Sequence, residues 1–254
     1  MARLVRDGVA LYYEDHGSGP AVLLTHGYGA TSQMWQGQIA AFADRYRVIV
    51  WDMRGHGESD YPDEPSLYSE AHTVADMAAL LDHCGIDRAV IGGLSLGGYS
   101  TLAFHLSHPD RCRALMLFDT GPGFKKDDAR DAWNKRAHER AERLEREGLA
   151  ARSESAEAQL AKHRDASGLA GAARGMLTQA DARVINSLPD IAVPTLVLVG
   201  ENDTPFLAAT DYMAAKIAGS TKAVIPNAGH AANLHNPEAF NRAMGDFLDG
   251  LPQS

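Results

Sequence analysis

The strongest chemical signal in this 254-residue sequence is a serine between glycines. The segment 93–98 reads Gly-Leu-Ser-Leu-Gly-Gly, follows a short apolar run at 89–92 and precedes a helical pattern that begins at Leu96. A Gly-x-Ser-x-Gly turn between a strand and a helix holds its serine exposed and strained, next to a helix N-terminus that favours developing negative charge. We therefore predict that Ser95 is a nucleophile.

A serine hydroxyl is a weak nucleophile unless a general base takes its proton. His230 follows the last predicted strand of the chain and stands directly behind Gly229. His235 lies five residues further on and is the competing candidate, which we expect to flank a helix instead. We predict that His230 is the base.

The base needs an acidic partner, and the loop at 200–205 follows the strand predicted at 195–199. It contains Asp203, 27 residues before His230, and Glu201 as a local alternative. Asp119 ends another predicted strand and is a second alternative. We predict Asp203 to be the acid, with Asp119 next.

Acyl transfer also needs two N–H groups directed at the developing oxyanion. Leu96, directly after the nucleophile, is predicted to supply one. The loop that reads His-Gly-Tyr-Gly at 26–29 follows an apolar run and is predicted to supply the other from Tyr28. We expect His26 to be a structural residue of that loop.

The elements that position these groups alternate along the chain. Short unbroken apolar runs, typical of parallel strands buried on both faces, alternate with helical patterns. They predict an α/β fold with a mostly parallel central sheet, helices on both of its faces and a core made of residues 1–120 and 191–254. Residues 121–190 contain no strand pattern and are predicted to form a helical cap or lid inserted between two strands, with helices at 127–147, 153–164 and 168–179.

Side chains of this insertion are candidates for contact with a substrate. Phe124 and Trp133 are its aromatic residues, and Met176 and Leu177 are predicted to join them facing the site. Packing between the insertion and the body is an equally good interpretation of all four. A carboxylated substrate would require an arginine here, and the sequence does not choose among Arg136, Arg140, Arg143, Arg174 and Arg183.

Composition excludes some partners. A formal charge of −9, from 24 basic and 33 acidic residues, argues against nucleic acid and anionic membranes. Cys84 and Cys112 have no metal-ligand spacing, and we predict no metal and no cofactor. The N-terminus lacks the apolar stretch of a signal peptide and no window is long enough to span a bilayer, so a cytoplasmic protein is expected.

Five segments in order resemble the α/β-hydrolase superfamily: 26–29, 52–59, 93–98, 200–205 and 227–230. The resemblance runs from about residue 9 to residue 251. It implies an α/β-hydrolase fold, a Ser-His-Asp triad and an insertion lying over the nucleophile as a lid. The segment 52–59 resembles the turn Asp-x-Arg-Gly-x-Gly-x-Ser, in which Arg54 and His56 would be scaffold residues.

Within the superfamily, a serine at position 95 departs from haloalkane dehalogenases and epoxide hydrolases, which carry an aspartate there. The chain is more similar to compact carboxylesterases and 3-oxoadipate enol-lactonases. This resemblance implies hydrolysis of a small ester or lactone through an acyl-enzyme. Alternatives are a C–C bond hydrolase of aromatic catabolism and a ligand receptor built on a hydrolase scaffold. The oligomeric state, a homo-oligomer included, is left open.

Overall fold

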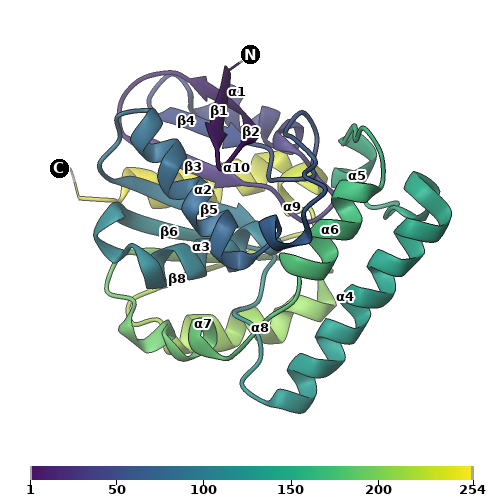
Figure 1. Ribbon diagram of the computed structural model, residues 1–254. Coiled ribbons are helices and arrows are strands. Elements are labelled where there is room, and N and C mark those ends of the chain that lie inside the picture. The colour runs from purple at the N-terminus through teal and green to yellow at the C-terminus, as the bar shows by residue number, and fades with distance from the viewer. Residues whose placement is uncertain (1, 253–254) are drawn as a thin grey trace.

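A twisted sheet forms the centre of the protein in the computed structural model, which describes residues 2–252 (Figure 1). Its eight strands lie in the order β1-β2-β4-β3-β5-β6-β7-β8. In chain order they span Ala2–Arg6, Val9–His16, Ala21–Thr25, Arg47–Trp51, Ala89–Leu94, Cys112–Phe118, Thr195–Gly200 and Thr221–Ile225. The first two pairings, β1 with β2 and β2 with β4, are antiparallel, and the remaining pairings are parallel. The predicted mostly parallel sheet is confirmed.

Successive residues of the strands alternate between two hydrophobic cores, one on each face of the sheet. Leu23 packs into one core and Leu24 into the other, which explains why the runs are apolar throughout. One face is covered by α1 (Gln36–Phe42) and α10 (Pro237–Asp249). The opposite face is covered by α2 (Glu70–His83), α3 (Leu96–Ser107) and α8 (Thr204–Lys216).

The strand order fixes where a site can form. The chain leaves β3 towards β4 on one side and then returns to place β5 on the other side of β3. Such a reversal opens a crevice at the carboxyl ends of the two central strands, where α/β sheets bind ligands. The loop after β3 and the turn after β5, which contains Ser95, therefore meet at this crevice.

The chain between β6 and β7 is helical throughout its regular elements. It contains α4 (Asp127–Glu147), α5 (Ala156–Leu160), α6 (Ser167–Gly175) and α7 (Arg183–Asn186), and the short helix α9 (Ala232–His235) follows later. The prediction for α4 is confirmed, and α6 begins and ends earlier than predicted. None of the helices within 2–252 combines the length and the apolar composition that crossing a bilayer requires.

The helix predicted at 153–164 is wrong in extent, because only Ala156–Leu160 is helical. Ala161 turns the chain into an extended conformation. Beyond it the backbone N–H of Arg164 donates to the Tyr61 hydroxyl of the body at 3.1 Å. A five-residue helix has little stability of its own, so contacts with the body decide the conformation of the following residues.

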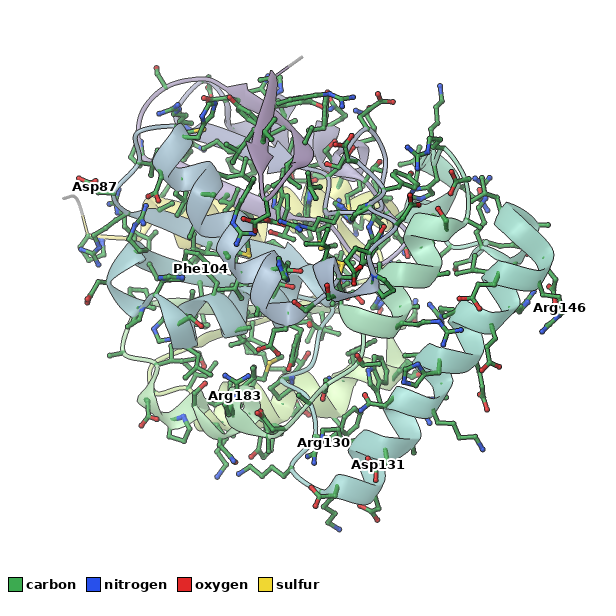
Figure 2. All side chains as sticks on the ribbon, viewed as in Figure 1. Asp87, Phe104, Arg130, Asp131, Arg146 and Arg183 are labelled. Atoms are coloured by element: carbon green, nitrogen blue, oxygen red, sulfur yellow. The ribbon has the colours of Figure 1, made fainter. Side chains whose placement is uncertain are left out.

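The insertion, residues 121–190, packs in two different ways. Helix α4 stands away from the sheet, with Arg146 and Asp131 directed outwards (Figure 2). It rests on α6 through a small cluster that includes Ala141 and Leu144. The other face of α6 and the residues of α7 are part of the main core of the body. The second half of the insertion is thus fixed to the body, and α4 is attached to it mainly through α6.

Candidate active site

Ser95 occupies a strained turn between β5 and α3. Its φ of 56° and ψ of −114° lie where a residue with a Cβ is rarely found. A Cβ on Gly93 would lie 2.4 Å from the carbonyl carbon of Gly97, and one on Gly97 would lie 2.1 Å from the Thr25 oxygen. The two flanking glycines are therefore required by close backbone contact, and the turn predicted from the sequence is present.

Backbone and side-chain bonds hold this turn in place. The N–H of Ser95 donates to the Phe118 oxygen at 2.9 Å, and the Thr120 hydroxyl donates to the Ser95 oxygen at 2.6 Å. Both partners come from the end of β6 and the residues after it. The contact of Thr120 with the turn was not predicted, because a threonine after a strand resembles any turn residue.

His230 and Asp203 come together as predicted, from the loops after β8 and β7. The His230 Nδ1–H donates to Asp203 Oδ2 at 2.8 Å, which leaves Nε2 free to accept a proton. The ring of Phe206 stacks on the imidazole with centroids 4.9 Å apart. Phe206, on the first turn of α8, was not predicted, although its position three residues after the acid is a usable signal.

The environment of His230 favours its protonated form. Burial lowers the pKa of the imidazole, but the hydrogen bond and negative charge of Asp203 outweigh it. The pKa of His230 is therefore raised above its ordinary value of 6.5. An imidazole of this kind is a stronger base than a free one.

Glu201 and His235, the alternatives near Asp203 and His230 in the sequence, make other contacts. The Glu201 carboxylate accepts the backbone N–H of Asn227 at 3.0 Å, and His235 Nδ1 accepts that of Gly229 at 3.0 Å. Both bonds stabilise the loop that carries His230. Neither side chain is the partner of that imidazole.

Asp119 is fully buried beside this pair. Its Oδ1 accepts the N–H of Gly200 at 2.7 Å, and its Oδ2 has no partner among residues 2–252. Burial raises the pKa of this carboxyl to about 8. A carboxyl that is largely neutral at pH 7 cannot supply the negative charge that an imidazolium needs, so its environment favours Asp203 as the acid.

The loop at 26–29 brings Tyr28 to the cavity that Leu96 also lines. Within the described residues, neither the Tyr28 N–H nor the Leu96 N–H donates to another protein group. His26 Nδ1–H donates to the Gly27 oxygen at 2.7 Å, and burial lowers the pKa of this ring to about 3. His26 is thus a neutral structural residue, as expected. Arg54 is likewise buried in an ion pair with Asp76 at 2.7 Å.

A cavity of about 540 Å³ lies over these groups and is lined by Ser95, His230, Leu96 and Tyr28. Of the four side chains predicted to contact a substrate, Phe124, Trp133 and Leu177 also line it. Met176 does not. It is buried in the main core, so for Met176 the alternative interpretation, packing of the insertion on the body, applies.

The structure also distinguishes among the five arginines of the insertion that were considered as partners of a substrate carboxylate. Arg143, Arg174 and Arg183 are paired with carboxylates at 3.0, 2.7 and 2.6 Å. Arg136 and Arg140 line the cavity, have no carboxylate partner among residues 2–252, and lie over the rings of Trp133 and Tyr28.

One acidic side chain lines the same cavity. Glu157 is buried and accepts the Ser155 hydroxyl at 2.6 Å. Its sequence context, in a charged and Ala-rich stretch, resembles a solvated helix face, which is why sequence reasoning passed over it.

Known proteins resemble this chain closely. The sequence profile described as alpha/beta hydrolase fold matches residues 20–163. A 3-oxoadipate enol-lactonase of Acinetobacter baylyi is 31% identical over 95% of this chain and 94% of its own length.

Solved structures resemble it as well. A thermophilic esterase from Thermogutta terrifontis, in a malate-bound structure, superposes with a TM-score of 0.86 at 31% identity, and the match covers all of both chains. An enol-lactonase from Burkholderia xenovorans superposes with a TM-score of 0.80 at 27% identity, over 98% of this chain and 100% of the other. The predicted fold is confirmed by these matches.

Isosteric substitution can distinguish the roles of the two buried aspartates, Asp203 and Asp119. We expect Asp203→Asn to lower kcat for ester hydrolysis by about four orders of magnitude. The reason is that His230 loses the carboxylate that orients its ring and stabilises the protonated imidazole. Asp119→Asn should stay within about ten-fold of the wild type, because its amide oxygen can still accept from Gly200. Steady-state kinetics on both variants test this. The reverse ranking would move the acid to Asp119.

The pH dependence of kcat/KM should report His230. The imidazole acts as a base only when neutral, so activity should fall as the pH drops through its pKa. Because that pKa is raised, the midpoint is expected above pH 6.5. Asp119→Asn is the control, because it removes the carboxyl whose pKa is raised to about 8. The acidic limb of its kcat/KM profile should match that of the wild type. A profile that is flat from pH 5 to pH 8 would contradict the assignment.

Proposed function

The chain belongs to the alpha/beta hydrolase fold family, and on that premise we propose that it is a serine hydrolase that cleaves carboxylic esters through an acyl-enzyme on Ser95. One observation carries the proposal. The imidazole of His230 is held at Nδ1 by Asp203, 2.8 Å away, and lines the same cavity as a serine on a strained turn. The names of the similar esterase and enol-lactonases support it.

In the proposed reaction, His230 Nε2 takes the hydroxyl proton of Ser95 as Oγ attacks the ester carbonyl. The N–H groups of Leu96 and Tyr28 bind the oxyanion of the tetrahedral intermediate. The imidazolium returns its proton to the leaving alcohol as the C–O bond breaks, and the acyl group stays on Ser95. Water, deprotonated by His230, then releases the acid and restores the serine.

Substitution of the nucleophile tests the proposal directly. Ser95→Ala should lower kcat for 4-nitrophenyl butyrate by about six orders of magnitude, because the triad acts as a unit. Ser107→Ala, on the exposed end of the same helix, is the matched control and should keep wild-type activity. A fluorophosphonate probe should add its mass once to the wild type and to the control, but not to Ser95→Ala. Near-normal turnover by Ser95→Ala would contradict the proposal.

A second candidate, hydrolysis of a carboxylated ester or lactone, is favoured by Arg136 and Arg140. Within the described part of the chain neither guanidinium group has a carboxylate partner. At the cavity beside Ser95 the two suit an anionic acyl group, because a charge-assisted hydrogen bond is stronger than a neutral one. Apolar side chains, Phe124 and Leu177 among them, line the same cavity. A short apolar chain that carries a carboxylate fits this combination. The similarity to enol-lactonases supports the same class.

The matched substrates monoethyl adipate and ethyl hexanoate differ mainly in that carboxylate. The double variant Arg136→Gln/Arg140→Gln should lower kcat/KM for the anionic ester by about 10- to 100-fold, and leave the neutral ester within about two-fold. Arg143→Gln, whose arginine is paired with Glu147, is the control and should change neither. A γ-lactone with a side-chain carboxylate, compared with its methyl ester, extends the test to lactones.

Equal losses on both esters would contradict the carboxylate preference and leave the ester hydrolase proposal standing. Slow or single turnover on every ester and lactone would instead favour a ligand-binding protein. Cleavage of a vinylogous diketone in preference to all esters would favour a C–C bond hydrolase.

A further inference from the structure

We propose that His163 is a positioning residue of the insertion that orients the oxyanion loop, the residues Gly27–Gly29. Through it, contact between the insertion and the body sets the direction of the Tyr28 N–H. This inference rests on the proposed function, because it concerns the oxyanion donor of that reaction.

Three successive peptide groups of the loop are each bound by one histidine ring. The Gly27 oxygen accepts His26 Nδ1–H at 2.7 Å, the Gly29 N–H donates to His56 Nε2 at 3.2 Å, and the Gly29 oxygen accepts His163 Nε2–H at 3.0 Å. Because a peptide group is planar and trans, its N–H points opposite to its C=O. The Tyr28 N–H shares a peptide group with the Gly27 oxygen, so its direction follows that oxygen. The Gly27 oxygen also accepts the Ala30 N–H at 3.1 Å, and that N–H shares a peptide group with the Gly29 oxygen that His163 holds.

The second ring nitrogen of each histidine is also used. His26 Nε2 accepts from Met53 N–H at 3.0 Å, His56 Nδ1–H donates to the Arg54 oxygen at 3.0 Å, and His163 Nδ1 accepts from Gly57 N–H at 3.2 Å. A ring that accepts at one nitrogen and donates at the other is neutral.

Electrostatics agrees with this tautomer assignment. Burial lowers the pKa of all three rings, and each imidazole sits within 6 Å of the next, with centroids 4.9 and 5.8 Å apart. The rings form one connected row, which runs from the body to the insertion.

His163 is the member of this row that belongs to the insertion. It is 134 residues away from Gly29 in the chain and lies in the irregular stretch between α5 and α6. Its bonds to Gly29 and Gly57 join the loop after β3 to the turn at 52–59, and its Nδ1 also lies 3.5 Å from the Tyr61 hydroxyl. No helix holds it, so these bonds decide where the ring lies.

Other contacts fix the insertion at the same corner without touching the Gly29 peptide. The Tyr28 hydroxyl donates to the Leu169 oxygen at 2.8 Å. A Cβ on Gly168 would lie 2.3 Å from the Gly55 oxygen, so the two backbones are in direct contact. Loss of the His163 side chain should therefore free the oxyanion loop while the insertion stays docked.

A matched pair of variants separates the two bonds of His163. In His163→Gln the amide nitrogen reaches about the position of Nε2, so the bond to Gly29 is kept and that to Gly57 is lost. In His163→Asn the amide reaches about the position of Nδ1, so the bond to Gly57 is kept and that to Gly29 is lost. Because the two side chains are chemically alike, a difference between them reports on Gly29.

We expect His163→Asn to lower kcat for 4-nitrophenyl butyrate by about 10- to 100-fold with KM within about three-fold, because a misplaced donor weakens binding of the transition state. Affinity for phenylboronic acid, which mimics the tetrahedral oxyanion, should fall by the same factor, and inhibition by butyrate should not change. His163→Gln should keep most of the activity. His138→Phe, an exposed histidine of α4, is the control and should match the wild type.

Equal losses in His163→Asn and His163→Gln, or a raised KM with unchanged kcat, would overturn the proposal and leave a merely structural contact. Hydrogen exchange provides a readout that needs no substrate. Amides of residues 26–35 should exchange about ten-fold faster in His163→Asn than in the wild type or in His163→Gln. If the wild type hydrolyses no ester or lactone, the proposed function fails, and the exchange data still decide whether His163 holds the loop.

Discussion

The site depends on one contact, in which the backbone of Gly97 packs against the carbonyl oxygen of Thr25. A Cβ at position 97 would lie 2.1 Å from that oxygen, so the start of α3 can approach the end of β3 only as glycine. This approach brings the first N–H of α3 next to the loop that follows β3. It also forces the residue between β5 and α3 into a left-handed conformation, which exposes its side chain. The positions of Ser95 and of the two proposed oxyanion donors follow from the same contact.

Neutral buried groups support that geometry. The three histidine rings around the oxyanion loop each accept one hydrogen bond and donate another, so a proton on any of them would remove an acceptor. Asp119 is similar, because burial keeps this carboxyl largely neutral while one oxygen accepts from Gly200. The charged pair beside Ser95 is His230 with Asp203. A neutral surrounding of low polarity strengthens the interaction between these two residues.

Much of this arrangement could be predicted from the sequence, because its signals are local. The strands are apolar runs, and the turn that carries Ser95 is a pentapeptide. The predicted acid and base follow consecutive strands, so the parallel sheet brings them to one edge. What could not be predicted depends on contacts between distant segments. The role of His163 needs Gly29, 134 residues away, and the choice between Asp203 and Asp119 needs their burial. The helix predicted at 153–164 failed for the same reason, because contacts with the body end it early.

Helix α4 shows how one element can link packing to specificity. Ala137, Ala141 and Leu144 are spaced i, i+4, i+7 and are buried, and the last two pack on α6. Trp133, Arg136 and Arg140, at i, i+3, i+7, form the neighbouring stripe and face the cavity. The small residues allow α4 to lie close to α6, and this contact sets the rotation of the helix about its axis. The rotation in turn directs this stripe towards the cavity. Arg143 continues the stripe at i+10 but does not line the cavity, and it pairs with Glu147 instead. The proposed preference for an anionic substrate therefore depends on alanine packing along the neighbouring stripe of the same helix.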